Sequence, residues 1–362
     1  MFKVRKLDRY IIGKFLGTFF FAITLLMFIT VIFDLSEKLD EFMENEAPPK
    51  LIITNYYFNF VPYFAVLFTP LFTFISVIFF TSRMAYNTEI IAMLSSGVSF
   101  RRLLVPYIVS AVIIMGLNIY LVNYVIPKAN AERFQFEEQY YHHSVQSFKE
   151  KNVHRQIDPG VIIYLESYHT QNDYGQKFSV EKYSGDTLVS KLISKSIRWD
   201  STIKKWNIRD YFIRDYHDGQ QTFQMGESID TVLNMKPEDF RRRDNAIEAM
   251  NRRELNEFID KQKLSGASQI DLCLVEKHKR VSFPFSTIIL SIIGVSVSSR
   301  KVRGGVGMHI GIGLLVASSY ILFMQFSTQF SIGGNFPPFL AVWTPNIIFG
   351  TIAALLYRIA PK

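Results

Sequence analysis

The chain has few residues arranged for catalysis. No G-x-x-x-x-G-K-[ST], H-E-x-x-H or G-x-S-x-G motif occurs, which excludes the usual nucleotide-phosphate loop, zinc-protease site and esterase nucleophile. The glycine-rich segment 303–307 lacks the Lys-Ser/Thr step and a preceding strand. We interpret it as a turn between two helices.

The histidines and the cysteine form no convincing site either. His142 and His143 are adjacent, and sequence neighbours do not share a helix face, so a surface pair is favoured over a metal site. His278 lies in the polar cluster 276–280, where no nucleophile is near. The only cysteine, Cys273, excludes an intrachain disulfide and zinc sites built on paired cysteines. We predict a protein that is not an enzyme and binds no cofactor.

The composition indicates a membrane protein with one substantial water-soluble part. Hydrophobic residues make up 49% of the 362 residues and charged residues 20%, whereas soluble chains usually carry about 25% charge. The mean hydropathy is +0.13. These values exclude disordered, collagen-like and disulfide-rich secreted chains.

Six segments are long and apolar enough, or nearly so, to cross a bilayer, which takes about 20 apolar residues. They are residues 10–33, 56–80, 103–125, 281–299, 306–330 and 339–357. The first is not a signal peptide, because its apolar run is too long and no small-residue cleavage site follows it. The spans contain no carboxylate, so the chain has no visible proton or sodium coupling of its own.

The positions of Lys and Arg predict the orientation, because these residues gather beside the cytoplasmic ends of spans. One side collects Lys3, Arg5, Lys6, Arg9, Arg83, Arg101, Arg102, Arg300, Lys301, Arg303, Arg358 and Lys362. The opposite short loops, 34–55 and 331–338, contain only Lys38 and Lys50. Both termini are predicted to be cytoplasmic, and the net charge of +8 reflects this topology, with no nucleic-acid partner expected.

A polar insert separates the first three spans from the last three, which divides the chain into residues 1–127, 128–280 and 281–362. The predicted strands of the insert, rich in Ile, Val and aromatic residues, are 161–168, 178–183, 188–199 and 206–216, with edge pieces at 222–225 and 229–233. Their even spacing is typical of a sandwich or jelly roll. We therefore predict a membrane α-helical bundle of six spans, arranged 3+3, with an inserted periplasmic all-β, jelly-roll-like domain.

Other features of the insert are less decisive. Helices are predicted at 129–141 and 251–263, and Trp199 and Trp206 are expected to pair across a hairpin. The basic run 241–243 is either a solvated surface or a contact for an anionic ligand. The strand pattern leaves open whether the domain closes its own core or leaves an apolar seam that holds acyl chains.

The loop between the second and third spans carries a short predicted helix at about 84–98. Asn87 can cap it, Glu89 suits its first turn, and Gly97 ends it. Its apolar residues are Ile90, Ile91, Met93 and Leu94. Such a stripe predicts either a helix lying on the lipid surface or a coupling helix that inserts into a groove of a cytoplasmic motor subunit.

Five short motifs follow one another along nearly the whole chain. They are Leu7-Asp8-Arg9-Tyr10, Asn87-Thr88-Glu89 with Met93 and Gly97-Val98-Ser99, Glu276-x-His278-Lys279-Arg280 with Pro284, Arg303-Gly304-Gly305, and Trp343-x-Pro345-Asn346. In this order, with three spans on each side of an insert, they resemble the LptF/LptG permeases of the lipopolysaccharide exporter. The opening motif is more similar to the LptG member.

The resemblance implies a permease in the inner membrane of a Gram-negative bacterium, paired with a second LptF/LptG-type permease on a dimer of the ATPase LptB. LptB would bind the ATP and Mg²⁺. The first and fifth helices, 10–33 and 306–330, would form gates through which lipopolysaccharide enters a central cavity. The lipid would then pass through the periplasmic β domains to an LptC-type partner and a periplasmic bridge.

The resemblance also implies roles for individual residues. The coupling helix would contact LptB through Asn87, Glu89, Ile90, Met93, Leu94 and Gly97, and the gate and cavity would include Phe33, Lys38, Arg303 and His309. One departure concerns 34–41, where LptG-like chains carry lysines that meet lipid phosphates. This stretch is acidic and would repel phosphate, so Lys38 alone, bridging divalent cations or a less phosphorylated lipid are the options.

The physical cost of lipid extraction makes an external motor necessary, because each CH₂ exposed to water costs about 0.8 kcal/mol. Two other hypotheses remain. The chain could be the permease of another ATPase-coupled envelope export system, for lipoprotein or peptide, or a membrane-anchored periplasmic scaffold that binds a ligand. A membrane enzyme is disfavoured because no nucleophile or metal set converges.

Overall fold

The computed structural model describes residues 6–141, 149–169, 172–217, 220–240, 244–265, 270–299, 305–334 and 336–360. The chain forms two compact units. The helical unit comprises Met1–Phe136, Glu248–Arg252 and Asp271–Lys362, and the β unit comprises Glu137–Ile247 and Arg253–Ile270.

Within its described residues, the helical unit contains six helical stretches long and apolar enough to cross a membrane, which confirms the predicted number of spans. The elements of the first half are α1 (Lys6–Glu44), α2 (Pro49–Leu51), the π-helical turn η1 (Ile52–Tyr57), α3 (Phe58–Tyr86), α4 (Glu89–Ser95), α5 (Phe100–Tyr120), the π-helical turn η2 (Leu121–Val125) and α6 (Ile126–Tyr140). Those of the second half are α9 (Ile270–Ser298), α10 (Gly305–Ile332) and α11 (Pro338–Ile359). The first span continues to Glu44, well past its predicted end at residue 33, because the polar stretch that follows the apolar run also forms helix.

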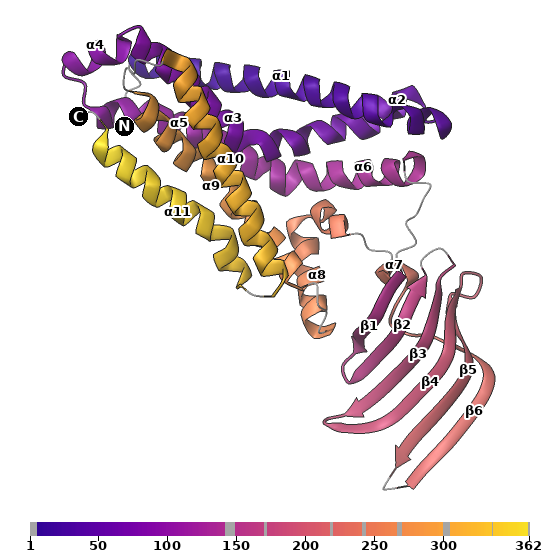
Figure 1. Ribbon diagram of the computed structural model, residues 1–362. Helices are drawn as coiled ribbons and strands as arrows, with labels where there is room; N and C mark the ends of the chain where they lie inside the picture. The colour runs from indigo at the N-terminus through magenta and orange to yellow at the C-terminus, as the bar shows by residue number, and fades with distance from the viewer. Residues whose placement is uncertain are drawn as a thin grey trace. The chain divides into compact units, whose positions relative to one another are not determined.

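The helix α3 is central, since it packs against both α1 and α10 (Figure 1). Glycines permit the closest approaches. A Cβ added to Gly294 of α9 would lie 2.8 Å from Val77 Cγ1, and one added to Gly313 of α10 would lie 2.5 Å from Ile78 Cδ1. Small residues at helix contacts are the usual route to tight packing inside a membrane.

The β unit is one antiparallel six-stranded sheet in which every strand pairs with its neighbour in the chain. The strands are β1 (Lys149–Asp158), β2 (Val161–His169), β3 (Tyr174–Ser184), β4 (Thr187–Asp200), β5 (Lys205–His217) and β6 (Gln220–Thr231). The inserted β domain is thus confirmed. Its described strands form a meander, whereas a jelly roll needs Greek-key connections between two sheets.

A bend crosses this sheet without shifting its register. Lys177 of β3 and Asp210 of β5 have positive φ angles of 48° and 50°. The two residues lie at the same level across the strands, and the residue pairs on either side of this level keep their register. On β2, Leu165 and Tyr168 are three positions apart yet both contact the Cβ position of Gly175. The bend therefore turns apolar side chains to the same face on both of its sides.

The buried face of the sheet is built around tryptophan. Trp206 is fully buried, donates from Nε1 to the Met235 carbonyl at 2.9 Å, and contacts Trp199 edge to face across the β4–β5 hairpin, as predicted. Phe240, in α7 (Pro237–Phe240), stacks on Tyr168. The β unit thus has its own core.

The chain leaves the sheet through η3 (Asp244–Ala249) and α8 (Arg252–Ser265). The helices predicted at 129–141 and 251–263 correspond to α6 and α8 and are confirmed. His142, His143 and the basic run 241–243 lie outside the described residues.

Candidate functional site

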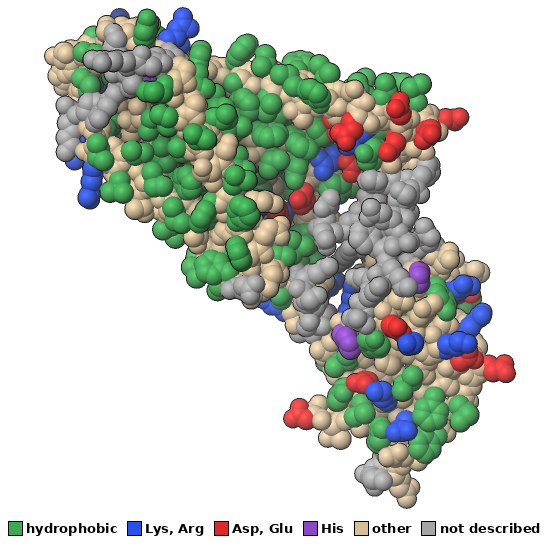
Figure 2. Space-filling view, in the orientation of Figure 1, with side chains coloured by type: hydrophobic (Ala, Val, Ile, Leu, Met, Phe, Trp, Pro, Cys, Tyr) green, Lys and Arg blue, Asp and Glu red, His purple; other side chains and the backbone are tan. Residues whose placement is uncertain are grey.

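Two spans, α1 and α10, expose most of their apolar surface. In each, only 22% of the most apolar stretch is buried, against 56% in the span that contains α3 and 61% in α9. The large exposed side chains of α1 include Phe21, Phe28, Ile32 and Phe33, and those of α10 include Leu315, Leu322, Phe326 and Phe330. Hydrophobic side chains cover much of the visible face of the helical unit (Figure 2).

Both of these spans also carry an exposed pair of glycines four residues apart. A Cβ added at Gly13 or Gly17 on α1, or at Gly307 or Gly311 on α10, would have no atom within 4 Å. Glycine pairs at this spacing let another helix approach closely in a membrane. These faces are therefore open to a further helix.

The loop helix α4 packs against the bundle on one side and is exposed on the other. Ile90 is fully buried in a core with Met84 and Phe100, and Met93 and Leu94 pack against the same core. Ile91 is 47% exposed. The predicted apolar stripe is therefore divided, and Ile91 is its member most available to a partner.

The predicted capping role of Asn87 is wrong. Thr88 takes the N-cap position of α4 with a left-handed φ of 62° and forms no side-chain capping bond. Asn87 closes α3 instead, donating its backbone N–H to the Arg83 carbonyl at 3.0 Å. Because α3 runs on to Tyr86, only two residues remain for the reversal into α4, and a left-handed residue makes it possible. Gly97 ends α4 with φ 89°, as predicted.

Polar contacts from the beginning of α1 reach both α5 and α4. Both terminal nitrogens of Arg102 donate to the Asp8 carboxylate at 2.6 Å, a bidentate pair in which Asp8 is buried. Tyr10 donates to Glu89 Oε2 at 3.2 Å. Asp8 and Tyr10 come from one sequence motif, so this motif links the beginning of α1 to α5 and to α4. Neither residue was predicted from the sequence to have a role of its own, although a lone carboxylate at the start of a span was a usable indication.

Comparison with known protein families settles the relationship. The chain matches the family of lipopolysaccharide export system permeases LptF/LptG over residues 9–359, nearly its whole length. It belongs to the LptF/LptG family. No curated protein matches the chain at a significant level. The chain is therefore a permease of the lipopolysaccharide export system, a transport subunit and not itself an enzyme, and a multi-pass protein of the inner membrane.

In this LptF/LptG permease, the motif Trp343-x-Pro345-Asn346 supplies a buried link between three helices. Tyr320 of α10 donates to Asn346 Oδ1 at 2.9 Å, and Asn346 Nδ2 donates to the Ser282 carbonyl of α9 at 2.8 Å. All three residues are buried. The asparagine thereby satisfies both ends of its amide inside the bundle.

The predicted gate residues on α1 differ in their surroundings. Phe33 is 72% exposed. Lys38 forms an ion pair with Asp34 at 3.0 Å and donates to the Tyr56 hydroxyl, and its side chain is only 14% exposed. Tyr57 also donates to Asp34, at 3.3 Å. The lysine is thus neutralised within the chain, while the acidic side chains beyond it remain exposed.

The remaining gate predictions concern the region around α10. His309 is buried, and its Nδ1 lies 2.8 Å from Ser82 Oγ of α3. This places the histidine between two helices of the bundle. Arg303 lies outside the described residues.

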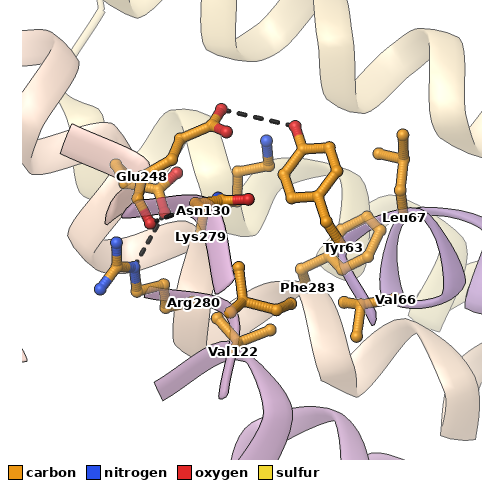
Figure 3. A pocket seen from close by; sticks show the side chains of 11 residues that line it. Tyr63, Val66, Leu67, Val122, Asn130, Glu248, Lys279, Arg280 and Phe283 are labelled. Carbon is orange, nitrogen blue, oxygen red and sulfur yellow. Dashed lines mark hydrogen bonds and ion pairs between the residues drawn. The ribbon is translucent and has the colours of Figure 1, made fainter. Parts of the chain in front are cut away.

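A polar cluster lies in the helical unit, where the chain re-enters it after the β unit (Figure 3). Arg280 donates to Glu276 Oε1 at 2.8 Å and to the Met250 carbonyl at 2.7 Å. Tyr63 and Glu248 point toward each other across a small cavity of about 70 Å³ and lie 3.5 Å apart. Such a volume holds about two waters, so the cavity is too small for a lipid chain.

The carboxyl group of Glu248 has a raised pKa. Burial raises its pKa, and the neighbouring charge of Glu276 raises it further, while Lys279, Tyr63 and Arg133 act in the opposite direction. Glu248 was not predicted from the sequence, because nothing in its local sequence distinguishes it from a surface carboxylate.

Proposed function

We propose that this permease works in an ATP-driven exporter that extracts lipopolysaccharide from the inner membrane and passes it to a periplasmic bridge. It pairs with a second LptF/LptG-type permease and is driven by an LptB-type ATPase dimer, which binds the ATP and Mg²⁺. An LptC-type partner receives the lipid. The observation that carries the proposal is the family match, which spans the bundle and the inserted sheet alike.

The arrangement of α4 supports coupling to a motor. The buried Ile90 and the Tyr10–Glu89 hydrogen bond fix the helix to the bundle, so a push on it is transmitted to α1. Ile91 projects a hydrophobic side chain from a seven-residue helix. A short, firmly seated helix with one large exposed apolar residue suits insertion into a groove of another subunit.

The surfaces of α1 and α10 support a pairing of permeases around a lipid path. Their exposed aromatic side chains suit acyl chains, and their open glycine pairs suit close contact with a helix of the partner. Lipopolysaccharide entering between such helices stays in apolar surroundings, which avoids the cost of about 0.8 kcal/mol for each exposed CH₂ group.

The proposal is tested by co-expressing the chain with an LptB-type ATPase and a partner permease. Ile91→Asp should abolish copurification of the ATPase and lipid-stimulated ATP hydrolysis. Ile203→Asp is the matched control, because Ile203 is 48% exposed in a turn of the sheet. If the ATPase binds the Ile91→Asp chain as well as wild type, coupling through α4 is wrong.

The orientation, with both termini cytoplasmic and the sheet in the periplasm, is part of the proposal. In a Cys273→Ser background, Asp186→Cys in the exposed β3–β4 turn should react with a membrane-impermeant thiol reagent in cells with a permeabilised outer membrane. Ser96→Cys beside α4 should react only after the inner membrane is opened. The reverse pattern would invert the topology.

A further inference from the structure

A groove of about 470 Å³ runs between α1, α3 and α5. No lining residue is charged. On α1 its lining extends from Phe19 to Val31, which at 1.5 Å per residue corresponds to roughly 18 Å of helix. Two of its lining residues form a buried polar pair, in which Thr69 Oγ1 lies 3.3 Å from Asn118 Oδ1. An elongated apolar groove inside a membrane-spanning bundle matches an acyl chain in shape and polarity.

A second cavity, of about 480 Å³, adjoins the groove at Phe58, which lines both. This second cavity is lined by apolar, aromatic and charged side chains. Tyr120 and Tyr124 are exposed and their rings lie 5.6 Å apart, in the manner of interfacial aromatic residues. Lys128 and Glu132 lie one helical turn apart on α6.

The polar groups of this second cavity carry both signs of charge. The Glu132 carboxylate is fixed by a 3.0 Å hydrogen bond from Asn59 Nδ2, and Lys128 is exposed to solvent. A headgroup that joins a phosphate to an ammonium matches this pair, with the phosphate at Lys128 and the ammonium at Glu132. A purely anionic headgroup would meet repulsion from Glu132.

We propose that the groove and the adjoining cavity together form a binding site for a resident zwitterionic phospholipid. One acyl chain lies between α1, α3 and α5, and the phosphoammonium headgroup lies beside Lys128 and Glu132. This lipid is part of the folded bundle and is distinct from the exported cargo. The inference requires only a membrane-spanning bundle, so it stands or falls separately from coupling to an ATPase.

The test is native mass spectrometry of the full chain, delipidated in detergent and titrated with dipalmitoyl phosphatidylethanolamine. Wild type should retain one lipid at low concentration and bind dipalmitoyl phosphatidylglycerol more weakly. Ala65→Phe fills the groove and should weaken phosphatidylethanolamine binding about tenfold. Ile113→Phe is the control, because Ile113 is exposed on α5 outside both cavities, and it should bind as wild type.

Headgroup recognition is tested with Lys128→Glu, which should weaken binding about fivefold, while Lys50→Glu, at another exposed lysine, should not. If Ala65→Phe fails to fold, Thr24→Phe fills the groove from α1 instead. Equal retention by wild type and a folded groove-filling variant would overturn the proposal. So would occupation of the site by lipopolysaccharide that phosphatidylethanolamine cannot displace.

Discussion

Four of the six described spans form two contrasting pairs, while the spans that contain α5 and α11 are intermediate, at 33% buried. The helices α3 and α9 are buried and meet through Gly294, which lies against Val77 and Phe74. The helices α1 and α10 are largely exposed, and their glycine pairs face open space. Glycine therefore serves tight internal packing at Gly294 and Gly313, against α3, and an unoccupied face at the glycine pairs of α1 and α10. This contrast indicates that α3 and α9 form a fixed scaffold, whereas α1 and α10 have apolar surfaces available to partners or lipid.

Among the substitutions that test this contrast, the largest loss of stability is expected at Gly294. Gly294→Leu should destabilise the bundle by about 3 kcal/mol, because a branched side chain would collide with stiff, β-branched Val77. Gly311→Leu on the exposed face of α10 should leave the stability almost unchanged. Thermal unfolding in detergent, followed by size-exclusion chromatography, measures both. Equal losses would mean that the two pairs of helices do not differ as described.

The link between α9, α10 and α11 should give the next largest effect. Asn346→Leu removes both buried hydrogen bonds and leaves the Tyr320 hydroxyl without its acceptor, at a cost of about 2 kcal/mol. Tyr320→Phe should cost about 1 kcal/mol, since Asn346 keeps its bond to Ser282. The same unfolding assay ranks the two variants. A more stable Asn346→Leu chain would contradict this account.

The Asp8–Arg102 pair should have a moderate effect, confined to the region where α1, α4 and α5 begin. Asp8→Asn removes the bidentate acceptor and should lower the melting temperature by a few degrees and loosen α4. The exchange Asp8→Arg with Arg102→Asp should recover part of the loss. Hydrogen exchange of the α4 amides is the specific readout, and unchanged protection in Asp8→Asn would show that the pair does not position this helix.

Glu248 should give the smallest effect, which depends on pH in the direction that follows. Its pKa is raised in the folded chain by burial and by Glu276, so the folded state holds the proton more tightly than the unfolded state. The stability from this group is therefore present at low pH and lost as the pH rises through the folded-state pKa. Glu248→Gln should be slightly more stable than wild type at neutral pH, and the difference should vanish in acid. A difference that grows in acid would contradict the assignment.

Some of these features follow from the sequence and others need the structure. Long apolar runs predicted the spans, because a bilayer imposes one length scale on every helix. The strand β1 was missed, since its first residues, Lys149, Glu150 and Lys151, lack the apolar pattern of a strand. The strand β6 was predicted as two pieces because Gly226, Glu227 and Ser228 interrupt its apolar residues.

The candidate site was predictable only in its local part. A turn, a short helix and its terminal glycine are set by neighbouring residues, so α4 was found. The pairing of Asp8 with Arg102 joins positions 94 residues apart, and no local pattern specifies it. The burial of Ile90 beside the exposed Ile91 likewise depends on how α4 sits on α5 and α3.

Under the proposed function, this permease moves lipopolysaccharide only when an external ATPase acts on it through α4. The most direct measurement is release of lipopolysaccharide from proteoliposomes that contain the chain, a partner permease, an LptB-type ATPase and an LptC-type acceptor. We predict release that requires ATP and disappears with Ile91→Asp but persists with Ile203→Asp. Release without ATP, or undiminished release by the Ile91→Asp chain, would contradict the account.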